Sequence, residues 1–353
     1  MPVKLEIPPS PSLTATWMWE GYLLLRERGV SEVLGHLTDE LNGLLVGNDW
    51  KVLRRKFGKE EGMSIAALAE RLAFQPDEDV VITSVVKPDE GYQAVGSVEY
   101  VRAPFTRVKN EGFSLQLLKL ERYQWVTVLE LGALGEQVTP YADRYATFLL
   151  LAGVASTYAA KTPREYIFLL YDPVTLSNME GRGELALSIK AAAKEALRAA
   201  VEELREWNEE YITLRVVFNE EFVHRARSYE LRSLGFRVIR VRREGQSLKV
   251  YGDTPLTVFL ERSIYQNRQL LQRINNALSK LAAPLSNYLQ GRDTWGDGYH
   301  ALRALKNLYM YYETGDLTFL AQYNREVHAM AEAIPQGEAR QRRRRQEYLC
   351  AVL

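Results

Sequence analysis

The chain has 353 residues, of which 46% are hydrophobic, with 45 basic and 45 acidic side chains. This length and composition are typical of a folded protein with a large core and about two or three domains. The balanced charge excludes a globally cationic nucleic-acid binder, and the single cysteine, Cys350, excludes a disulfide framework or a cysteine-built zinc site within one chain.

The N-terminus lacks the basic region, clean apolar stretch and small-residue cleavage site of a secretory signal. No segment reaches about 18 uninterrupted apolar residues, the length that a membrane-spanning helix needs. We therefore expect a soluble, cytoplasmic protein that does not contact a membrane. Abundant Arg, Glu and Tyr with little Cys indicate a heat-adapted source.

The first part of the chain has the apolar spacing of helices, which we predict over 10–27, 31–46 and 64–74, with Ser31 and Ser64 as N-caps. Between the last two lies the stretch DWKVLRRKFGKEEG, residues 49–62, which gathers five cations into nine positions. Its apolar residues follow helical spacing, so we predict a short amphipathic helix with a cationic outer face. Such a face suits either water or phosphate.

From residue 79 the pattern changes to short segments rich in Val, Tyr and Leu that are separated by turn residues. We predict strands at 79–86, 92–101, 113–121 and 123–131 in a mostly antiparallel sheet. The connection RAPFTRVKNEG carries a second basic cluster around Phe105, and a loop at a sheet edge is well placed to contact nucleic acid. The same residues also suit a solvated hairpin.

The following segment predicts an α/β unit. Residues 143–160 are apolar nearly all round, as in a helix buried on both sides. Strands expected at 165–173, 212–218, 236–245 and 248–253 alternate with helices, which favours at least one parallel pair. Arginines on the strand FRVIRVRREG indicate either an edge strand protected by charge or a strand that faces a polyanion.

The chain then becomes helical from residue 256 and ends in a charged segment that contains four consecutive arginines. The predicted fold class is therefore α+β: a mixed α/β region with an antiparallel sheet and a parallel α/β unit, followed by a C-terminal helical bundle. The predicted divisions are a mixed domain at 1–255 (helices 10–74, β-rich 79–132, α/β unit 143–255), a bundle at 256–335 and a mobile basic tail at 336–353.

Motifs of catalysis are missing from the sequence: it has no Walker loop, GxGxxG, HExxH or GxSxG. Asp293, Asp297 and His300 could reach one divalent ion, but Asp and Gly are also ordinary residues of an inter-helix turn. Asp172 and Glu180 follow a strand, where α/β sites commonly lie, and Asp-Pro is equally a common turn. We predict no catalytic residue, no metal and no cofactor.

Basic clusters remain the best candidates for function. The residues that we predict to bind nucleic acid are Lys51, Arg54, Arg55, Lys56, Lys59, Arg102, Arg107, Lys109, Arg237, Arg240, Arg242 and Arg243. Local patches of this kind create their own positive field in a neutral protein. Aromatic side chains beside them add stacking surfaces for single strands.

The order of these segments resembles the large subunit of archaeal subtype I-A CRISPR interference complexes, the Csa-type CRISPR-associated proteins. The resemblance lies in a tryptophan-bearing N-terminal helix, a β-rich middle, a buried helix leading into REYIFLLYDP, an α/β unit and a C-terminal bundle. It is one of layout and length over most of the chain, with no short diagnostic motif.

This resemblance implies a non-enzymatic role in antiviral defence. Its implied partners are target DNA, a guide RNA–protein complex and other CRISPR-associated subunits, including the helicase-nuclease. The subunit would help to recognise the protospacer-adjacent motif and hold the displaced strand, and in related large subunits the C-terminal bundle contacts minor subunits and DNA. Two alternatives stay open: a metal-dependent nuclease or nucleotide-handling enzyme, and a structural scaffold whose basic faces meet acidic protein partners.

Overall fold

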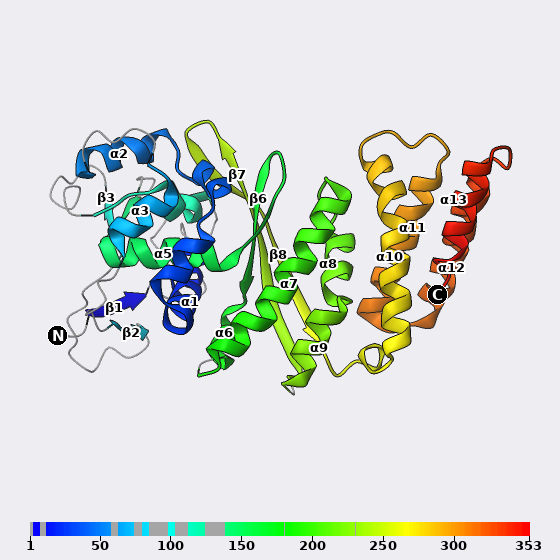
Figure 1. Cartoon of the computed structure of the whole chain (residues 1–353), viewed down its shortest axis with the longest axis horizontal. Helices are drawn as coiled ribbons and strands as arrows, with labels where there is room; N and C mark the ends of the chain where they lie inside the picture. Colours follow the sequence, from blue (N-terminus) through cyan, green and yellow to red (C-terminus); the bar gives the residue numbers. More distant parts are fainter. Residues whose placement is uncertain are drawn as a thin grey trace. The chain divides into compact units, whose positions relative to one another are not determined.

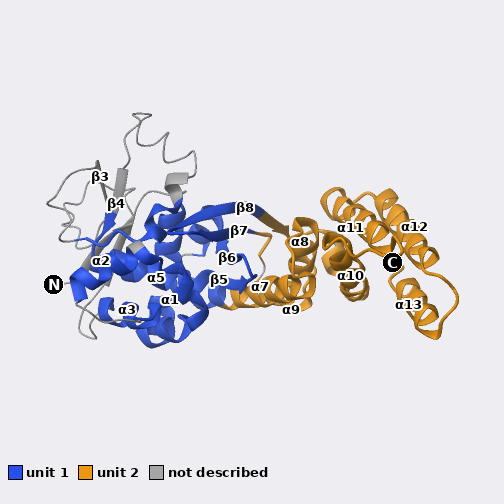
Figure 2. Cartoon of the chain, turned by 90° about the horizontal axis from the view of Figure 1, so that it is seen from above, with its two compact units in different colours: residues 1–187, 235–255 blue, residues 188–234, 256–353 orange. Residues whose placement is uncertain are grey.

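The computed structural model describes residues 3–7, 12–57, 63–73, 80–84, 98–102, 112–123, 138–179, 181–229 and 231–353. The chain divides into two compact units, the first formed by residues 1–187 and 235–255, the second by 188–234 and 256–353 (Figure 2). The second unit thus includes 188–234, which the sequence pattern placed in the mixed domain. Helices and a four-stranded antiparallel sheet confirm the α+β class.

The first unit begins with mainly helical elements (Figure 1). In chain order they are β1 (Val3–Ile7), α1 (Leu13–His36), the 3-10 helix η1 (Asp39–Leu44), α2 (Gly47–Phe57) and α3 (Ile65–Leu72). The Ser64 side chain accepts the Ala67 N–H and so caps α3, as predicted. The helix expected over 31–46 is divided, because its first part continues α1 beyond a kink at Gly29 and its second part is η1.

Helices α1 and α5 (Arg144–Thr157) form the centre of this unit. Residues 146–157 of α5 are all buried, which confirms the predicted buried helix. A Cβ added to Gly153 would collide with the Trp17 carbonyl, so glycine allows the two backbones to touch. The Trp17 indole N–H donates to Thr157 Oγ1 over 3.0 Å inside this interface.

Two small sheets accompany these helices. Strand β1 pairs in parallel with β2 (Val80–Ser84), whereas β3 (Val98–Arg102) is antiparallel to β4 (Val138–Ala142). The strand predicted at 113–121 was wrong, since residues Gln116–Tyr123 form the 3-10 helix η4, whose leucines are buried in the core. Most of the strand predicted at 123–131 lies outside the described residues.

A sheet in the order β5-β6-β7-β8 completes the first unit. Its strands are β5 (Tyr158–Lys161), β6 (Glu165–Tyr171), β7 (Ser233–Glu244) and β8 (Ser247–Phe259). Pairing is antiparallel between β5 and β6 and between β6 and β7, and β7 turns into β8 at Gly245 and Gln246. The prediction of a parallel pair here was wrong, because the segment 212–218 is helical rather than extended.

The other described elements of the chain are helices. They are α6 (Pro173–Asn178), α7 (Gly183–Leu204), α8 (Glu209–Val217), α9 (Glu220–Ser228), the 3-10 helix η5 (Ser263–Gln266), α10 (Arg268–Leu289), α11 (Asp297–Thr314), α12 (Leu317–Ala333) and α13 (Ala339–Leu349) (Figure 1).

In the described ranges, no helix has the length and apolar character required to cross a membrane.

Helix α13 corrects the expectation of a mobile tail at 336–353. A capping box between Glu338 and Gln341 begins the helix, and Tyr348 on its inner face is 3% exposed. Beyond the helix, the Ala351 carbonyl accepts the Tyr323 hydroxyl over 2.8 Å. The segment is ordered because one aromatic residue and its terminal backbone pack on the bundle, although its composition is highly polar.

Candidate nucleic-acid interface

Helix α2 carries the first predicted basic cluster and is fixed to the core by its apolar face. Leu53 is 2% exposed, while Trp50 and Phe57 are half-buried and pack against the same core. The structure thus confirms the predicted amphipathic helix. The anchored face directs the remaining side chains of α2 outward.

Three cations on this outer face, Lys51, Arg54 and Arg55, are exposed and form no ion pair among the described residues. Lys56 is partly buried, and its Nζ lies 4.3 Å from the centroid of the Phe113 ring. Phe57 stacks on the same ring at 5.9 Å. We call Lys51, Arg54, Arg55 and Lys56 the α2 cluster, of which the first three are exposed.

Asp49 holds the beginning of α2. Its carboxylate accepts the N–H groups of Val46, at 3.0 Å, and Gln116, at 2.8 Å, and so joins the helix to η4. Burial raises the pKa of Asp49 to about 6, against the opposing effect of these hydrogen bonds and of Lys119. A buried carboxylate therefore positions a cationic helix.

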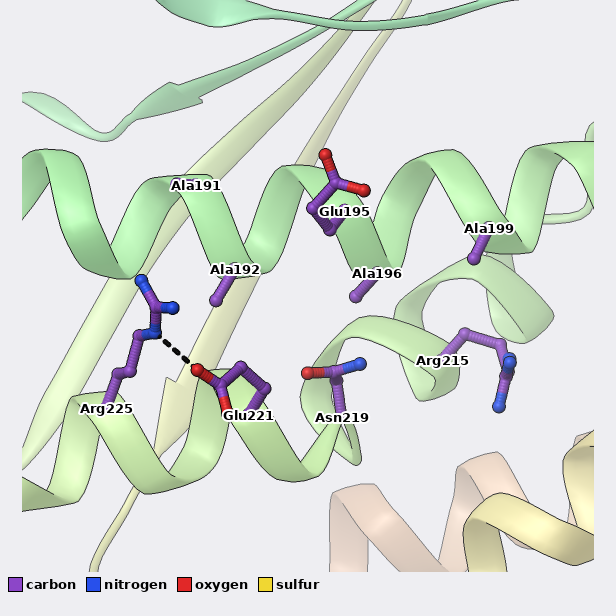
Figure 3. A pocket seen from close by; sticks show the side chains of 9 residues that line it. All are labelled: Ala191, Ala192, Glu195, Ala196, Ala199, Arg215, Asn219, Glu221 and Arg225. Carbon is purple, nitrogen blue, oxygen red and sulfur yellow. Dashed lines mark hydrogen bonds and ion pairs between the residues drawn. The ribbon is translucent and has the colours of Figure 1, made fainter.

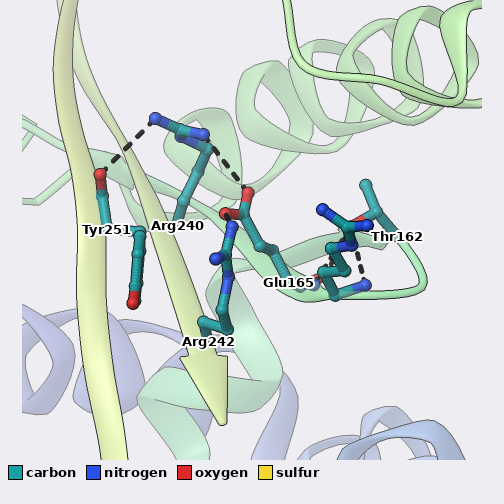
Figure 4. A network of polar contacts seen from close by, with 6 residues as sticks. Thr162, Glu165, Arg240, Arg242 and Tyr251 are labelled. Atoms are coloured by element: carbon teal, nitrogen blue, oxygen red, sulfur yellow. Dashed lines mark hydrogen bonds and ion pairs between the residues drawn. The ribbon is translucent and has the colours of Figure 1, made fainter. Parts of the chain in front are cut away.

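The strand arginines have a different environment from the α2 cluster. Arg237 forms a two-pronged pair with Asp253, at 2.5 Å and 3.2 Å. Arg242 and Arg240 both reach the Glu165 carboxylate, at 2.7 Å and 3.3 Å (Figure 4). The positive charge of Arg237 is thus neutralised within the sheet, whereas one carboxylate serves both Arg240 and Arg242.

Residues of the β5–β6 turn and the end of β7 surround a surface hollow of about 570 Å³. Its lining consists of Lys161, Thr162, Pro163, Arg164, Glu165, Tyr166, Arg242, Arg243 and Gly245. We call it the basic hollow, since four cations face one acid there. Lys161 and Arg164 were not among the residues predicted from the sequence, although they flank a turn-forming Thr-Pro in KTPRE.

The beginning of α2 lies beside the β7–β8 turn, whose Gly245 lines the basic hollow. A Cβ on Gly47, the first residue of α2, would collide with the side chain of Gln246 in the β7–β8 turn. A Cβ on Gly43 would likewise meet the Tyr166 hydroxyl at the hollow. The fold therefore places η1 and the first residue of α2 beside segments that lie more than 100 residues later in sequence.

Four of the residues predicted to bind nucleic acid have no described side chain. Lys59, Arg107 and Lys109 lie outside the described residues, and for Arg102 only its backbone position at the end of β3 is described. The remaining eight candidates belong to the α2 cluster or to strand β7.

The carboxylates considered for metal binding are engaged elsewhere. Asp293 accepts the N–H groups of Gly296, Gly298 and Tyr299 at the start of α11, as an ordinary turn residue does. Asp297 accepts from Arg344 and Tyr348, and His300 pairs with Glu326 at 2.8 Å. These side chains therefore have separate partners.

The second acidic candidate, Asp172, caps α6 by accepting the N–H groups of Val174 and Thr175, and Glu180 lies outside the described residues. Among the side chains that the structure describes, no three His, Cys, Asp or Glu residues are grouped as metal ligands would be.

A second hollow, of about 380 Å³, lies in the other unit along α7 and beside α9 (Figure 3). Alanines of α7 form one wall, and the Arg225–Glu221 pair, at 2.7 Å, lies opposite. Arg215 also lines this hollow and pairs with Glu203 at 2.8 Å. Since its arginines have acidic partners, this hollow is less suited to an anion than the basic hollow.

Comparison with known proteins gives one distant relative. An uncharacterised protein of Archaeoglobus fulgidus is 22% identical to this chain over 269 residues, which cover 69% of this chain and 67% of that protein. The chain matches no protein-family model and no solved structure.

Proposed function

We propose that this protein is a non-enzymatic nucleic-acid-binding subunit that holds DNA through phosphate contacts to the α2 cluster. The resemblance of its layout to CRISPR large subunits supports a place in an RNA-guided interference complex. In such a complex, base pairing to the guide supplies sequence specificity. The protein then needs only a short duplex reader and a cationic surface for the displaced strand.

The observation that carries this proposal is the exposure of Lys51, Arg54 and Arg55 on a helix whose other face is fixed to the core. Side chains used for internal packing or ion pairs are poorly available to a ligand. These three have no acidic partner in the part of the chain that the structure describes. A fixed array of cations creates the field that attracts a polyanion, and binding then releases the counterions of the phosphates.

A salt-titrated binding assay tests the proposal. Labelled single-stranded and double-stranded DNA would be titrated with the wild-type protein and with the double variant Arg54→Glu, Arg55→Glu. Each lost phosphate contact should reduce the slope of log affinity against log salt by about 0.7–0.9, depending on strandedness. The double variant should therefore bind at least about tenfold more weakly and with a smaller slope.

The matched control is Arg268→Glu, Lys280→Glu, which changes the charge equally at two exposed positions of α10. This control should keep most of the affinity. Unchanged affinity and slope in the α2 variant would contradict the proposal. Capture of protein partners by an isolated chain that binds neither DNA nor RNA would favour the scaffold instead.

A further inference from the structure

The four-stranded sheet carries more positive charge than its own acids can neutralise. Its two hairpins, residues 158–171 and 233–255, contain seven Lys or Arg and three Asp or Glu, which gives a net charge of +4. Each acid already has a cationic partner: Asp253 pairs with Arg237, Glu244 with Lys249, and Glu165 with both Arg240 and Arg242. The surplus cations therefore have no acid of their own within these two hairpins.

Most of that surplus gathers at the basic hollow. Lys161, Arg164 and Arg243 line it, are exposed, and form no ion pair with any described residue. Arg242 contributes to the same lining while sharing Glu165 with Arg240. Cations at a concave surface strengthen one another's field, because low-dielectric walls focus it.

Glu165 gives the hollow a fixed frame. It is 5% exposed, and its β6 position lies directly opposite Arg242 in the register with β7. Its carboxylate therefore holds the Arg242 guanidinium, which also lies 4.0 Å from the centroid of the Tyr251 ring (Figure 4). An arginine ordered in this way loses little side-chain entropy when it binds an anion.

The β5–β6 turn, which carries Lys161 and Arg164, is also well ordered. The Thr162 hydroxyl accepts the N–H groups of Glu165, at 3.0 Å, and Arg164, at 3.3 Å. The Thr162 N–H donates to the Glu165 carbonyl over 2.9 Å and closes the turn. Lys161, at the end of β5, lies with its Nζ 4.9 Å from the centroid of the Tyr166 ring. Hydrogen bonds of Thr162 thus fix the backbone positions of Lys161 and Arg164.

We propose that the basic hollow is a binding site for a phosphate group of a nucleotide strand, formed by Lys161, Arg164, Arg242 and Arg243. Arginine forks match the geometry of phosphate oxygens, and lysine adds a mobile point charge. Glu165 is a positioning residue, because it acts through Arg242 rather than on the ligand. The nature of the strand rests on the proposed function, whereas recognition of the phosphate rests on the hollow alone.

Binding of inorganic phosphate provides the direct test. Wild-type protein, the hollow variant Lys161→Gln, Arg164→Gln and the α2 variant Arg54→Gln, Arg55→Gln would be titrated with phosphate by calorimetry and by thermal unfolding, with chloride at equal ionic strength as reference. Both variants remove two exposed cations from the same unit. Phosphate should raise the unfolding midpoint of the wild type and the α2 variant, and should bind the hollow variant at least about tenfold more weakly.

Oligonucleotides then identify the source of the phosphate. A single-stranded sequence would be compared with a 5′-phosphate, with a 3′-phosphate and with two hydroxyl ends. Tighter binding of one phosphorylated end, lost in the hollow variant, would identify a terminal phosphate. If the three oligonucleotides bind the wild type with the same affinity, and the hollow variant weakens their binding by the same factor, the bound group is an internal phosphodiester.

The outcomes separate this inference from the proposed function. If inorganic phosphate binds the wild type and the hollow variant with equal affinity, or binds neither protein, the inference is wrong. The proposed function can still hold in that case, because it depends on DNA binding to α2. If phosphate binding requires the hollow but the wild type binds no nucleic acid, the phosphate site stands and the proposed function fails.

Discussion

Helices α2 and α13 are both eleven residues long and rich in basic residues, yet they use their charge in opposite ways. On α2, Lys51, Arg54 and Arg55 are exposed, and the helix is held by apolar residues and by Asp49. On α13 the central arginines hold the helix in place: Arg344 reaches Asp297, and Arg345 donates to the Ile334 carbonyl.

The difference lies in the partners that the fold supplies. Asp297 begins α11, 47 residues before Arg344, and is 3% exposed. The Arg344 guanidinium also lies 4.9 Å from the centroid of the Trp295 ring. A run of arginines is therefore a candidate ligand surface only after its internal contacts are known.

The largest effect should come from removing the acceptor that holds α13. Asp297→Ala leaves the Arg344 guanidinium and the Tyr348 hydroxyl without their shared partner. We expect the free energy of unfolding to fall by about 2–4 kcal/mol, measured by urea denaturation. As control, Glu347→Ala removes the exposed partner of Arg343 and should cost about 0.5 kcal/mol or less. Equal losses in both variants would contradict an internal role for Arg344.

The anchor of α2 should produce a pH-dependent effect. Because the pKa of Asp49 is raised to about 6 from its usual 3.8, the folded protein binds this proton more tightly than the unfolded chain does. This group therefore favours folding fully below about pH 3.8, and its contribution is lost as the pH rises through about 6.

The variant Asp49→Asn lacks that titration. Between about pH 4 and pH 7, its free energy of unfolding relative to wild type should change by about 2–2.5 kcal/mol in favour of the variant. The measurement is urea denaturation at a series of pH values. Parallel pH profiles for the two proteins would show that the Asp49 carboxyl keeps an ordinary pKa.

DNA binding compares the outer faces of the two helices directly. Arg54→Glu, Arg55→Glu should reduce affinity by at least about tenfold, or 1.4 kcal/mol. Arg340→Glu, Arg342→Glu changes the charge equally at exposed positions of α13 and should have a smaller effect. A larger loss in the α13 variant, in the same salt titration, would reverse the assignment of the two helices.

The smallest effect concerns the one partly buried cation of the α2 cluster. Lys56→Met keeps the aliphatic stem and removes the charge over the Phe113 ring. We expect a loss of about 0.5–1 kcal/mol in the free energy of unfolding, the size of a cation–π contact near the surface. Thermal unfolding at low and high salt measures it, with Lys51→Met as the exposed control. A loss of equal size at Lys51 would mean that the Phe113 ring contributes nothing.

The elements with strong local signals were predictable from the sequence. The serine cap of α3 and the continuous apolar surface of α5 are examples. The strand predicted at 212–218 was wrong. The β-branched residues of this segment favour a strand, but Asn208 caps a helix there, whose residues 211–214 are all buried. Tertiary burial thus outweighed local propensity in α8.

The candidate site was predictable only in part. The α2 cluster is continuous in sequence and has helical spacing, so its outward face could be inferred. For the arginines of β7, the sequence could not reveal that Glu165, 77 residues before Arg242, pairs across the strands. The basic hollow likewise depends on strand register, which local pattern does not specify.

The contact between α1 and α5 also bears on how the chain folds during synthesis. Trp17 meets Thr157, a residue 140 positions later. At a translation rate of about 5–20 residues per second, the N-terminal helix waits roughly 7–28 s before its partner leaves the ribosome. Throughout that interval the Trp17 face lacks its α5 partner, so we expect the nascent chain to need protection of this apolar surface.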